Sequence, residues 1–463
     1  MRIPERLAAI LAAWALLALL PQSVSASASE AVVRTLGNGM RVIVKTDRRA
    51  PVVVSMVWYR VGSVDEVNGE TGVAHVLEHM MFKGTKEVPA GEFSRIIAAA
   101  GGRDNAFTGR DYTAYFQTLH KSHLGLALRL EADRMVNLVL SPEEFEKEKR
   151  VVMEERRWRT DDRPHALVYE RLMANALIAH PYRHPVIGWM SDLEHMRLED
   201  AREFYETWYA PNNAILVVVG DVSPEVVFTL ATEHFGDLKP KPLPDRKPQE
   251  EPAQLGVKRL TVKAPAELPY VLMAFRVPSL RDPQKDWEPY ALEVLANVLD
   301  GNDAARIPRT LVRTERLANS AGASYEGIGR GPAMFYLDGV PGGKTSVAEL
   351  EQALRREVRK IAEEGVSEEE LKRVRAQVVA AHVYQRDSMF FQARQMGSVE
   401  TVGLSYRTPD VILEKLKQVT PAQVQEVARK YFRDDELTVA YLDPQPLTGR
   451  KPAAPPPGAR HGE

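Results

Sequence analysis

Two histidines and a glutamate stand close together in an order that suits metal-dependent hydrolysis. His75 and His79 are four positions apart, and the apolar spacing around them predicts a helix over residues 72–83. Positions i and i+4 of a helix share one face, so both imidazoles can reach one ion. Glu78 can touch a water on that ion and accept its proton. The alternative is a pair of solvated histidines, which fits poorly because this helix is largely apolar.

A second predicted helix, over residues 142–159, carries the other candidates. A catalytic zinc site needs a third protein ligand besides two histidines. Glu148 and Glu155 lie on the apolar stripe of this helix, together with Phe145 and Val152. A carboxylate on a buried face needs a metal, a cation or hydrogen bonds to offset its desolvation. We therefore assign Glu155 as the third ligand and Glu148 as the acceptor that orients an imidazole. The alternative for Glu148 is a buried arginine partner.

The composition restricts the ligands and the partners. The 463-residue chain contains no cysteine, so it forms no disulfides and must hold any metal through nitrogen and oxygen. This ligand set suits zinc, and it would also accept manganese or cobalt. The formal net charge of −2 gives no reason to expect a nucleic-acid partner. The length is too great for one compact core and predicts at least two domains.

The N-terminus has the pattern of a signal peptide. Arg2 and Arg6 precede an apolar run over residues 7–20, and small residues follow up to Ala28. The run is shorter than the ~20 apolar residues of a membrane span, and no later segment is apolar enough to cross a bilayer. We expect residues 1–28 to be removed. The exported protein then resides in a bacterial periplasm or is secreted.

The remaining chain divides into two halves. Prolines and charged residues dominate residues 239–254, which predicts a semi-rigid linker. The linker separates a zinc-bearing catalytic domain, residues 31–238, from a metal-free domain, residues 255–446. The composition of residues 447–463 predicts a disordered tail.

The two halves also resemble each other. The segment at 141–145 (SPEEF) has a counterpart at 367–371 (SEEEL), and a late strand at 215–219 has one at 437–441. A duplication predicts an α+β fold of two homologous domains, each a mostly antiparallel sheet with helices packed on one face. Within the first half, alternating residues predict a single strand over residues 105–119.

These motifs resemble the pitrilysin/insulinase family of inverted-motif zinc peptidases, and especially its two-domain branch, which includes the mitochondrial processing peptidase. The family order H-x-x-E-H is matched by His75, Glu78 and His79. Glu155 follows His79 by 76 positions, which is the family spacing. The family also places an acidic residue seven positions before that glutamate, and Glu148 matches it.

The resemblance extends over residues 31–445 and includes a further segment. Residues 101–108 (GGRDNAFT) are similar to the family's edge strand beside the metal. The resemblance implies that Asn105, Ala106 and Phe107 pair with the backbone of an extended peptide substrate.

One departure from the family concerns the metal-free domain. In the family, an arginine and a tyrosine of that domain contact the substrate, in a segment similar to residues 311–319. Arg313 matches the arginine, but Asn319 stands where the tyrosine is expected. The resemblance therefore implies a heterodimer in which a related zinc-free subunit supplies the Arg/Tyr pair. A homodimer is the alternative.

The expected function is that of a zinc-dependent endopeptidase with one Zn²⁺ per chain. It would cleave unfolded peptides through a metal-activated water, with Glu78 as general base. A different class of function also fits the fold, namely a non-catalytic peptide-binding or assembly protein. A zinc enzyme that acts on a non-peptide ester or amide is a further alternative.

Overall fold

The computed structural model describes residues 30–447. The predicted signal peptide, residues 1–28, lies outside the described residues, as does the predicted tail from residue 448 onward. Within the described range, no helix is both long and apolar enough to cross a membrane.

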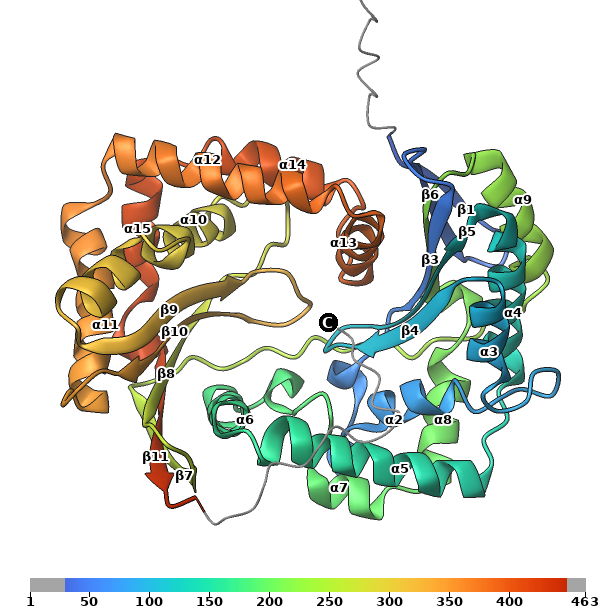
Figure 1. Cartoon of the computed structure of the whole chain (residues 1–463), viewed down its shortest axis with the longest axis horizontal. Coiled ribbons are helices and arrows are strands. Elements are labelled where there is room, and N and C mark those ends of the chain that lie inside the picture. Colours follow the sequence, from blue (N-terminus) through green and yellow to red (C-terminus); the bar gives the residue numbers. More distant parts are fainter. Residues whose placement is uncertain (1–29, 448–463) are drawn as a thin grey trace, which may run out of the picture.

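The first half contains a six-stranded sheet in the order β1-β2-β6-β3-β5-β4 (Figure 1, right). β2 and β6 run parallel, and all other neighbours run antiparallel. β6 is buried along its whole length, which explains its uninterrupted apolar sequence AILVVVG. The strands are β1 (Val32–Thr35), β2 (Arg41–Thr46), β3 (Val52–Tyr59), β4 (Arg103–Thr108), β5 (Thr113–His120) and β6 (Ala214–Gly220).

The second half repeats this topology in a five-stranded sheet of order β7-β11-β8-β10-β9 (Figure 1, left). Its first and last strands in chain order run parallel, as β2 and β6 do, and its other pairs run antiparallel. The shared order and directions support a duplication, and the predicted two-domain α+β fold is confirmed. The strands are β7 (Lys258–Pro265), β8 (Tyr270–Val277), β9 (Ala318–Glu326), β10 (Ala333–Pro341) and β11 (Leu437–Gln445).

In each half, helices of that half pack on one face of its sheet. Corresponding helices begin in the same way: Ser141 caps the helix that carries Glu148, and Ser367 caps its counterpart, each accepting a backbone N–H at 3.2 Å. The helices of the first half are α2 (Val73–Met80), α3 (Glu92–Ala99), α4 (Leu124–Asn137), α5 (Pro142–Arg156), α6 (Pro164–Ala176), α7 (Met190–His195), α8 (Leu198–Trp208) and α9 (Pro224–Phe235). The second half has α10 (Glu288–Asp300), α11 (Val347–Glu364), α12 (Glu368–Gln385), α13 (Met389–Thr401), α14 (Thr408–Leu416) and α15 (Pro421–Tyr431).

One helix of each half packs on the sheet of the other half. Ala393 and Met396 of α13 pack against Trp58 on the second face of the first sheet. Val168 and Leu172 of α6 pack in the same way on the second sheet. Figure 1 shows α13 and α6 lying between the two sheets. The exchange buries apolar faces that a single half would leave exposed, so it holds the two halves together.

Two sequence predictions can be compared with these elements. The single strand predicted over residues 105–119 is wrong, because two antiparallel strands, β4 and β5, occupy this region. A turn over residues 109–112 reverses the chain, and the alternation of apolar residues continues on both sides of it. Residues 239–254, predicted as a linker, contain no helix or strand. The linker is held against the first half, since Glu251 accepts the backbone N–H groups of residues 178–180 at 2.5–2.9 Å.

Candidate metal centre

The helix that bears the H-x-x-E-H sequence is buried at every position. It starts at Gly72, whose φ of +90° favours glycine, and a Cβ there would lie 2.7 Å from the carbonyl oxygen of Ile187. The carboxylate of Glu66 accepts the backbone N–H groups of Gly72 and Ala74, each at 2.9 Å. Burial raises the pKa of Glu66 to about 8, although these two hydrogen bonds act in the opposite direction. Glu66 therefore anchors the first turn of α2.

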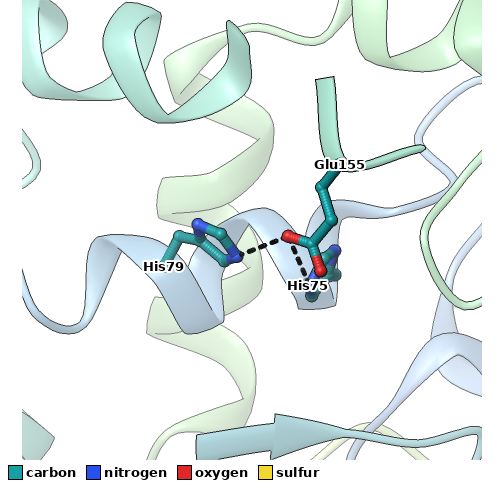
Figure 2. A group of neighbouring side chains, drawn as sticks. All are labelled: His75, His79 and Glu155. Atoms are coloured by element: carbon teal, nitrogen blue, oxygen red, sulfur yellow. Dashed lines mark ion pairs between the residues drawn. The ribbon is translucent and has the colours of Figure 1, made fainter. Parts of the chain in front are cut away.

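His75 and His79 of α2 meet Glu155 near the end of α5, as Figure 2 shows. The Nε2 atom of His79 lies 3.4 Å from Oε2 of Glu155, and the Nε2 atom of His75 lies 4.0 Å from the same oxygen. All three side chains are buried. The structure thus brings together the three residues that the sequence analysis assigned as ligands.

The donor atoms fit a metal ion. Nε2 of His79 and Oε2 of Glu155 are buried, and neither has a hydrogen-bond partner among residues 30–447. A buried polar atom without a partner costs free energy, which a bound cation would offset. Ligands ~2.0–2.1 Å from a tetrahedral zinc lie about 3.4 Å from one another. The His79–Glu155 separation matches this spacing, and a small rotation of the imidazole would bring His75 to it.

The charges around the three side chains also favour a cation. Burial, together with the neighbouring His79, lowers the pKa of His75 to about 3, so this imidazole is neutral and has a free lone pair. Burial acts to raise the pKa of Glu155, but both histidines outweigh it and lower the value to about 2. Burial likewise opposes protonation of His79, yet Glu148 and Glu155 raise its pKa to about 9. The site therefore carries an excess of negative charge when both imidazoles are neutral.

Glu148 lies on α5 and contacts the side chain of His79 on α2. Its Oε2 atom is 3.1 Å from Nδ1 of His79, and its Oε1 atom is 2.6 Å from Nζ of Lys83. A proton on Nδ1 leaves the lone pair on Nε2, the nitrogen that faces Glu155. Although burial opposes it, hydrogen bonding to His79 and Lys83 lowers the pKa of Glu148. The partners of Glu148 are thus His79 and Lys83, and not the arginine considered as an alternative.

Two further residues beside the site were missed by the sequence analysis. The hydroxyl of Thr108 at the end of β4 donates a 2.5 Å hydrogen bond to Oε2 of Glu78. Arg159, in the π-helical turn η3 (Arg157–Asp161), lies 2.8 Å from Oε1 of Glu155. Both follow a predicted site residue closely in the chain, Thr108 one position after Phe107 and Arg159 four positions after Glu155. A signal was present in the spacing: Arg159 is four positions after Glu155 on the predicted helix, and Thr108 is two positions after Ala106 in the predicted strand, so each shares a face with a predicted site residue.

The residues predicted to contact substrate lie in two separate places. Asn105, Ala106 and Phe107 belong to β4, which is the edge strand of the first sheet within the described residues. Ala106 is fully buried under the sheet, and Phe107 packs on the opposite face against Trp58. Arg313 lies in the second half, where its exposed guanidinium donates to the carbonyl of Asp303. No described contact joins Arg313 to the candidate metal ligands.

Comparison with known proteins identifies the family. Residues 41–188 match the family described as insulinase (peptidase family M16), and residues 195–378 match the peptidase M16 inactive domain. The chain is 32% identical over 425 residues to the zinc protease PqqE of Helicobacter pylori, which covers 89% of this chain and 92% of that protein. The chain belongs to the M16 peptidase family. The pitrilysin/insulinase resemblance seen in the sequence is therefore confirmed.

Solved structures share the fold of this M16 chain. A protease from Helicobacter pylori has a TM-score of 0.85 at 30% identity, covering 90% of this chain and 100% of that one. The periplasmic protease PqqL from Escherichia coli has a TM-score of 0.77 at 20% identity, covering 91% of this chain and 49% of PqqL. The M16 relatives are named as zinc proteases, which agrees with the nitrogen and oxygen donors that meet in the first half.

Proposed function

We propose that this M16 chain is a zinc-dependent endopeptidase, with one Zn²⁺ held by His75, His79 and Glu155. The observation that carries the proposal is the meeting of three buried donors from two helices, with a fourth residue, the acidic Glu78, on α2 as well. Three protein ligands leave a coordination position open, which distinguishes a catalytic zinc site from a structural one.

The chemistry is divided between the metal and the side chains. Zinc, when bound, acts as a Lewis acid on the scissile carbonyl and makes a water acidic enough to attack near neutral pH. Glu78 accepts the proton of that water and returns it to the leaving amine. Thr108 donates a hydrogen bond to Oε2 of Glu78 and so orients the carboxylate that takes the proton. Glu148 keeps the proton of His79 on Nδ1 and thereby directs Nε2 to the ion.

The substrate would be an extended peptide rather than a folded protein. Within the described residues β4 is the last strand of the first sheet, so a further strand could be added along Asn105–Phe107. The end of this strand is tied to Glu78 through Thr108. A peptide added along β4 would therefore run past the catalytic carboxylate. Main-chain hydrogen bonds select an extended conformation more than a particular amino-acid sequence.

The active form would be a dimer. We propose a catalytic domain at residues 31–238 and a metal-free domain at 255–446, joined by the linker at 239–254. Arg313 would act on substrate only in a pair of chains, in which a related zinc-free subunit contributes an arginine and a tyrosine. The fold of this chain spans about half of the E. coli protease PqqL, which agrees with an assembly larger than one chain. A homodimer remains the second arrangement to be tested.

We also propose that the protein is exported. The charged start, the apolar run and the small residues before position 28 support cleavage of residues 1–28 and a periplasmic or secreted location. Fractionation of cells followed by N-terminal sequencing of the mature protein tests this. An N-terminus still at Met1, or recovery in the cytoplasm, would contradict it.

The decisive experiment is to replace Glu78 by Gln in the purified mature protein. Glu78→Gln removes the base and leaves all three metal donors in place. We expect one zinc per chain in both proteins, and cleavage of a quenched peptide reduced at least ~100-fold in the variant. The assay is run with the protein alone and with the product of the neighbouring gene, as a test for a zinc-free partner subunit. If the wild-type protein binds zinc but cleaves no peptide in either mixture, the peptide-binding alternative is favoured. Full activity of Glu78→Gln rejects the mechanism.

A further inference from the structure

A cavity of about 510 Å³ lies between the two halves, and none of the candidate metal ligands lines it. Four arginines from four separate segments converge on it: Arg41 on β2, Arg60 after β3, Arg246 in the linker, and Arg330 in the loop between β9 and β10. Glu400 supplies the carboxylate among the lining residues. Such a concentration of guanidinium groups costs electrostatic free energy unless anions neutralise it.

Three of the four arginines have carboxylate partners. Nε of Arg41 lies 2.9 Å from Glu400, and Nε of Arg246 donates to Asp65 at 2.7 Å. Arg330 pairs with the same Asp65 at 2.7 Å, so this carboxylate is shared between the linker and the second half. Arg330 also pairs with Asp111 at 3.1 Å. The carboxylates of Glu400, Asp65 and Asp111 are therefore all paired with one of these three arginines.

Arg60 is the fourth cation, and its surroundings differ. Within residues 30–447 no carboxylate lies within 4.0 Å of its guanidinium, and its buried Nε atom has no hydrogen-bond acceptor. Burial lowers the pKa of Arg60, and Arg41 and Arg246 act in the same direction, against the opposite effect of Glu400. A half-buried guanidinium without a partner has lost hydration and gained no hydrogen bond in return.

We propose that this cavity binds an oxyanion, either a phosphate group or a carboxylate group, with Arg60 as its anchoring cation. A guanidinium presents two parallel N–H donors, and these match two oxygens of either group. The remaining arginines line the same space and would add charge without giving up their own partners. Because the walls come from both halves and the linker, a bound anion would stabilise their present arrangement. This proposal does not depend on the proposed peptidase activity.

The test measures binding to the full mature chain by isothermal titration calorimetry. The probes are inorganic phosphate, N-acetyl-dialanine, and the C-terminal amide of that dipeptide, all at matched ionic strength in chloride. We expect saturable 1:1 binding of phosphate or of the free acid, and no binding of the amide. The two anionic probes distinguish a phosphate ligand from the carboxylate terminus of a peptide. Replacement of Arg60 by Gln should weaken the binding at least tenfold.

A matched control distinguishes binding at a local site from attraction by the net charge of the protein. Arg359 is an exposed arginine on α11 that lines other grooves and not this cavity. Arg359→Gln lowers the net charge by the same amount as Arg60→Gln, and it should bind the anionic probes as tightly as the wild type does. In chloride alone, Arg60→Gln should melt at or above the wild-type temperature, since it removes an unpaired guanidinium. Equal binding by both variants, or no saturable binding by the wild type, overturns the proposal. The wild-type titration decides the matter even if Arg60→Gln fails to fold.

Discussion

The hydroxyl of Thr108 donates a 2.5 Å hydrogen bond to the carboxylate of Glu78. The two residues are 30 positions apart in the sequence, one at the end of the edge strand β4 and the other on the buried helix α2. The contact fixes the rotamer of Glu78 and also sets the distance between β4 and α2. The proposed general base and the proposed substrate-binding strand are therefore parts of one rigid unit.

Loss of this hydrogen bond should impair catalysis more than metal binding. We expect Thr108→Val, which keeps the shape and removes the donor, to lower kcat/KM by about 10–100-fold, because a hydrogen bond to a charged group is worth ~1.5–3 kcal/mol. The zinc content should remain at one per chain. Peptide cleavage and metal analysis of the purified variant provide the check. Thr108→Ser retains the hydroxyl and serves as the control. Equal losses in both variants would indicate a packing effect instead.

The carboxylate of Glu148 should influence zinc affinity without touching the ion. Glu148→Gln removes the charge opposite Nδ1 of His79, and we expect zinc to bind about 10–100-fold more weakly, as is usual for such supporting groups. Competition with a chelator of known affinity measures the change. Glu154→Gln is the matched control, because Glu154 is exposed on the same helix and pairs with Arg157. If the two variants release zinc alike, Glu148 does not orient His79.

Much of the candidate metal centre was predictable because helical spacing alone determines which side chains share a face. The stripe on α5 separated Glu155 from Glu154, and Glu155 is indeed buried whereas Glu154 is exposed. The i, i+4 spacing likewise placed His75 and His79 together, 4.9 Å between ring centres. Local periodicity was sufficient in both cases because the helices are regular.

Contacts between distant segments were not predictable in this way. The turn between β4 and β5 was missed because the apolar alternation is maintained on both sides of it. The exchange of α6 and α13 between the halves was also missed. Their sequences show which faces are apolar, but they do not show which of two similar sheets each face covers. The hydrogen bond from Thr108 to Glu78 depends on the same kind of long-range placement.

Glu66 should make the stability of the protein depend on pH. Its pKa is raised to about 8 in the folded chain, so protonated Glu66 favours the folded state. This stabilisation is complete below the unfolded pKa, near 4.5, and is lost as the pH rises through 8. Between pH 5.5 and 8.5 the loss amounts to about 3 kcal/mol. Glu66→Gln cannot titrate and should lack this part of the pH dependence. Urea unfolding of the metal-free wild type and of metal-free Glu66→Gln at the two pH values measures this loss. Parallel pH profiles of the two proteins would contradict the assignment.

Gly397 should be essential for the contact between α13 and the first sheet. A Cβ at this position would lie 2.1 Å from Cε2 of Trp58, a side chain that is fully buried against Phe107 and Tyr112. We expect Gly397→Ala to destabilise the protein by about 1–3 kcal/mol, because a packed core cannot admit an extra methyl group without moving the ring. Gly125→Ala on α4 is the control. Its Cβ would meet Leu230 at an ordinary 3.5 Å, and alanine should stabilise this helix by up to ~1 kcal/mol. Urea midpoints that shift in opposite directions would confirm the close approach. A Gly397→Ala midpoint equal to that of the wild type would show that α13 can move away from Trp58 at no cost.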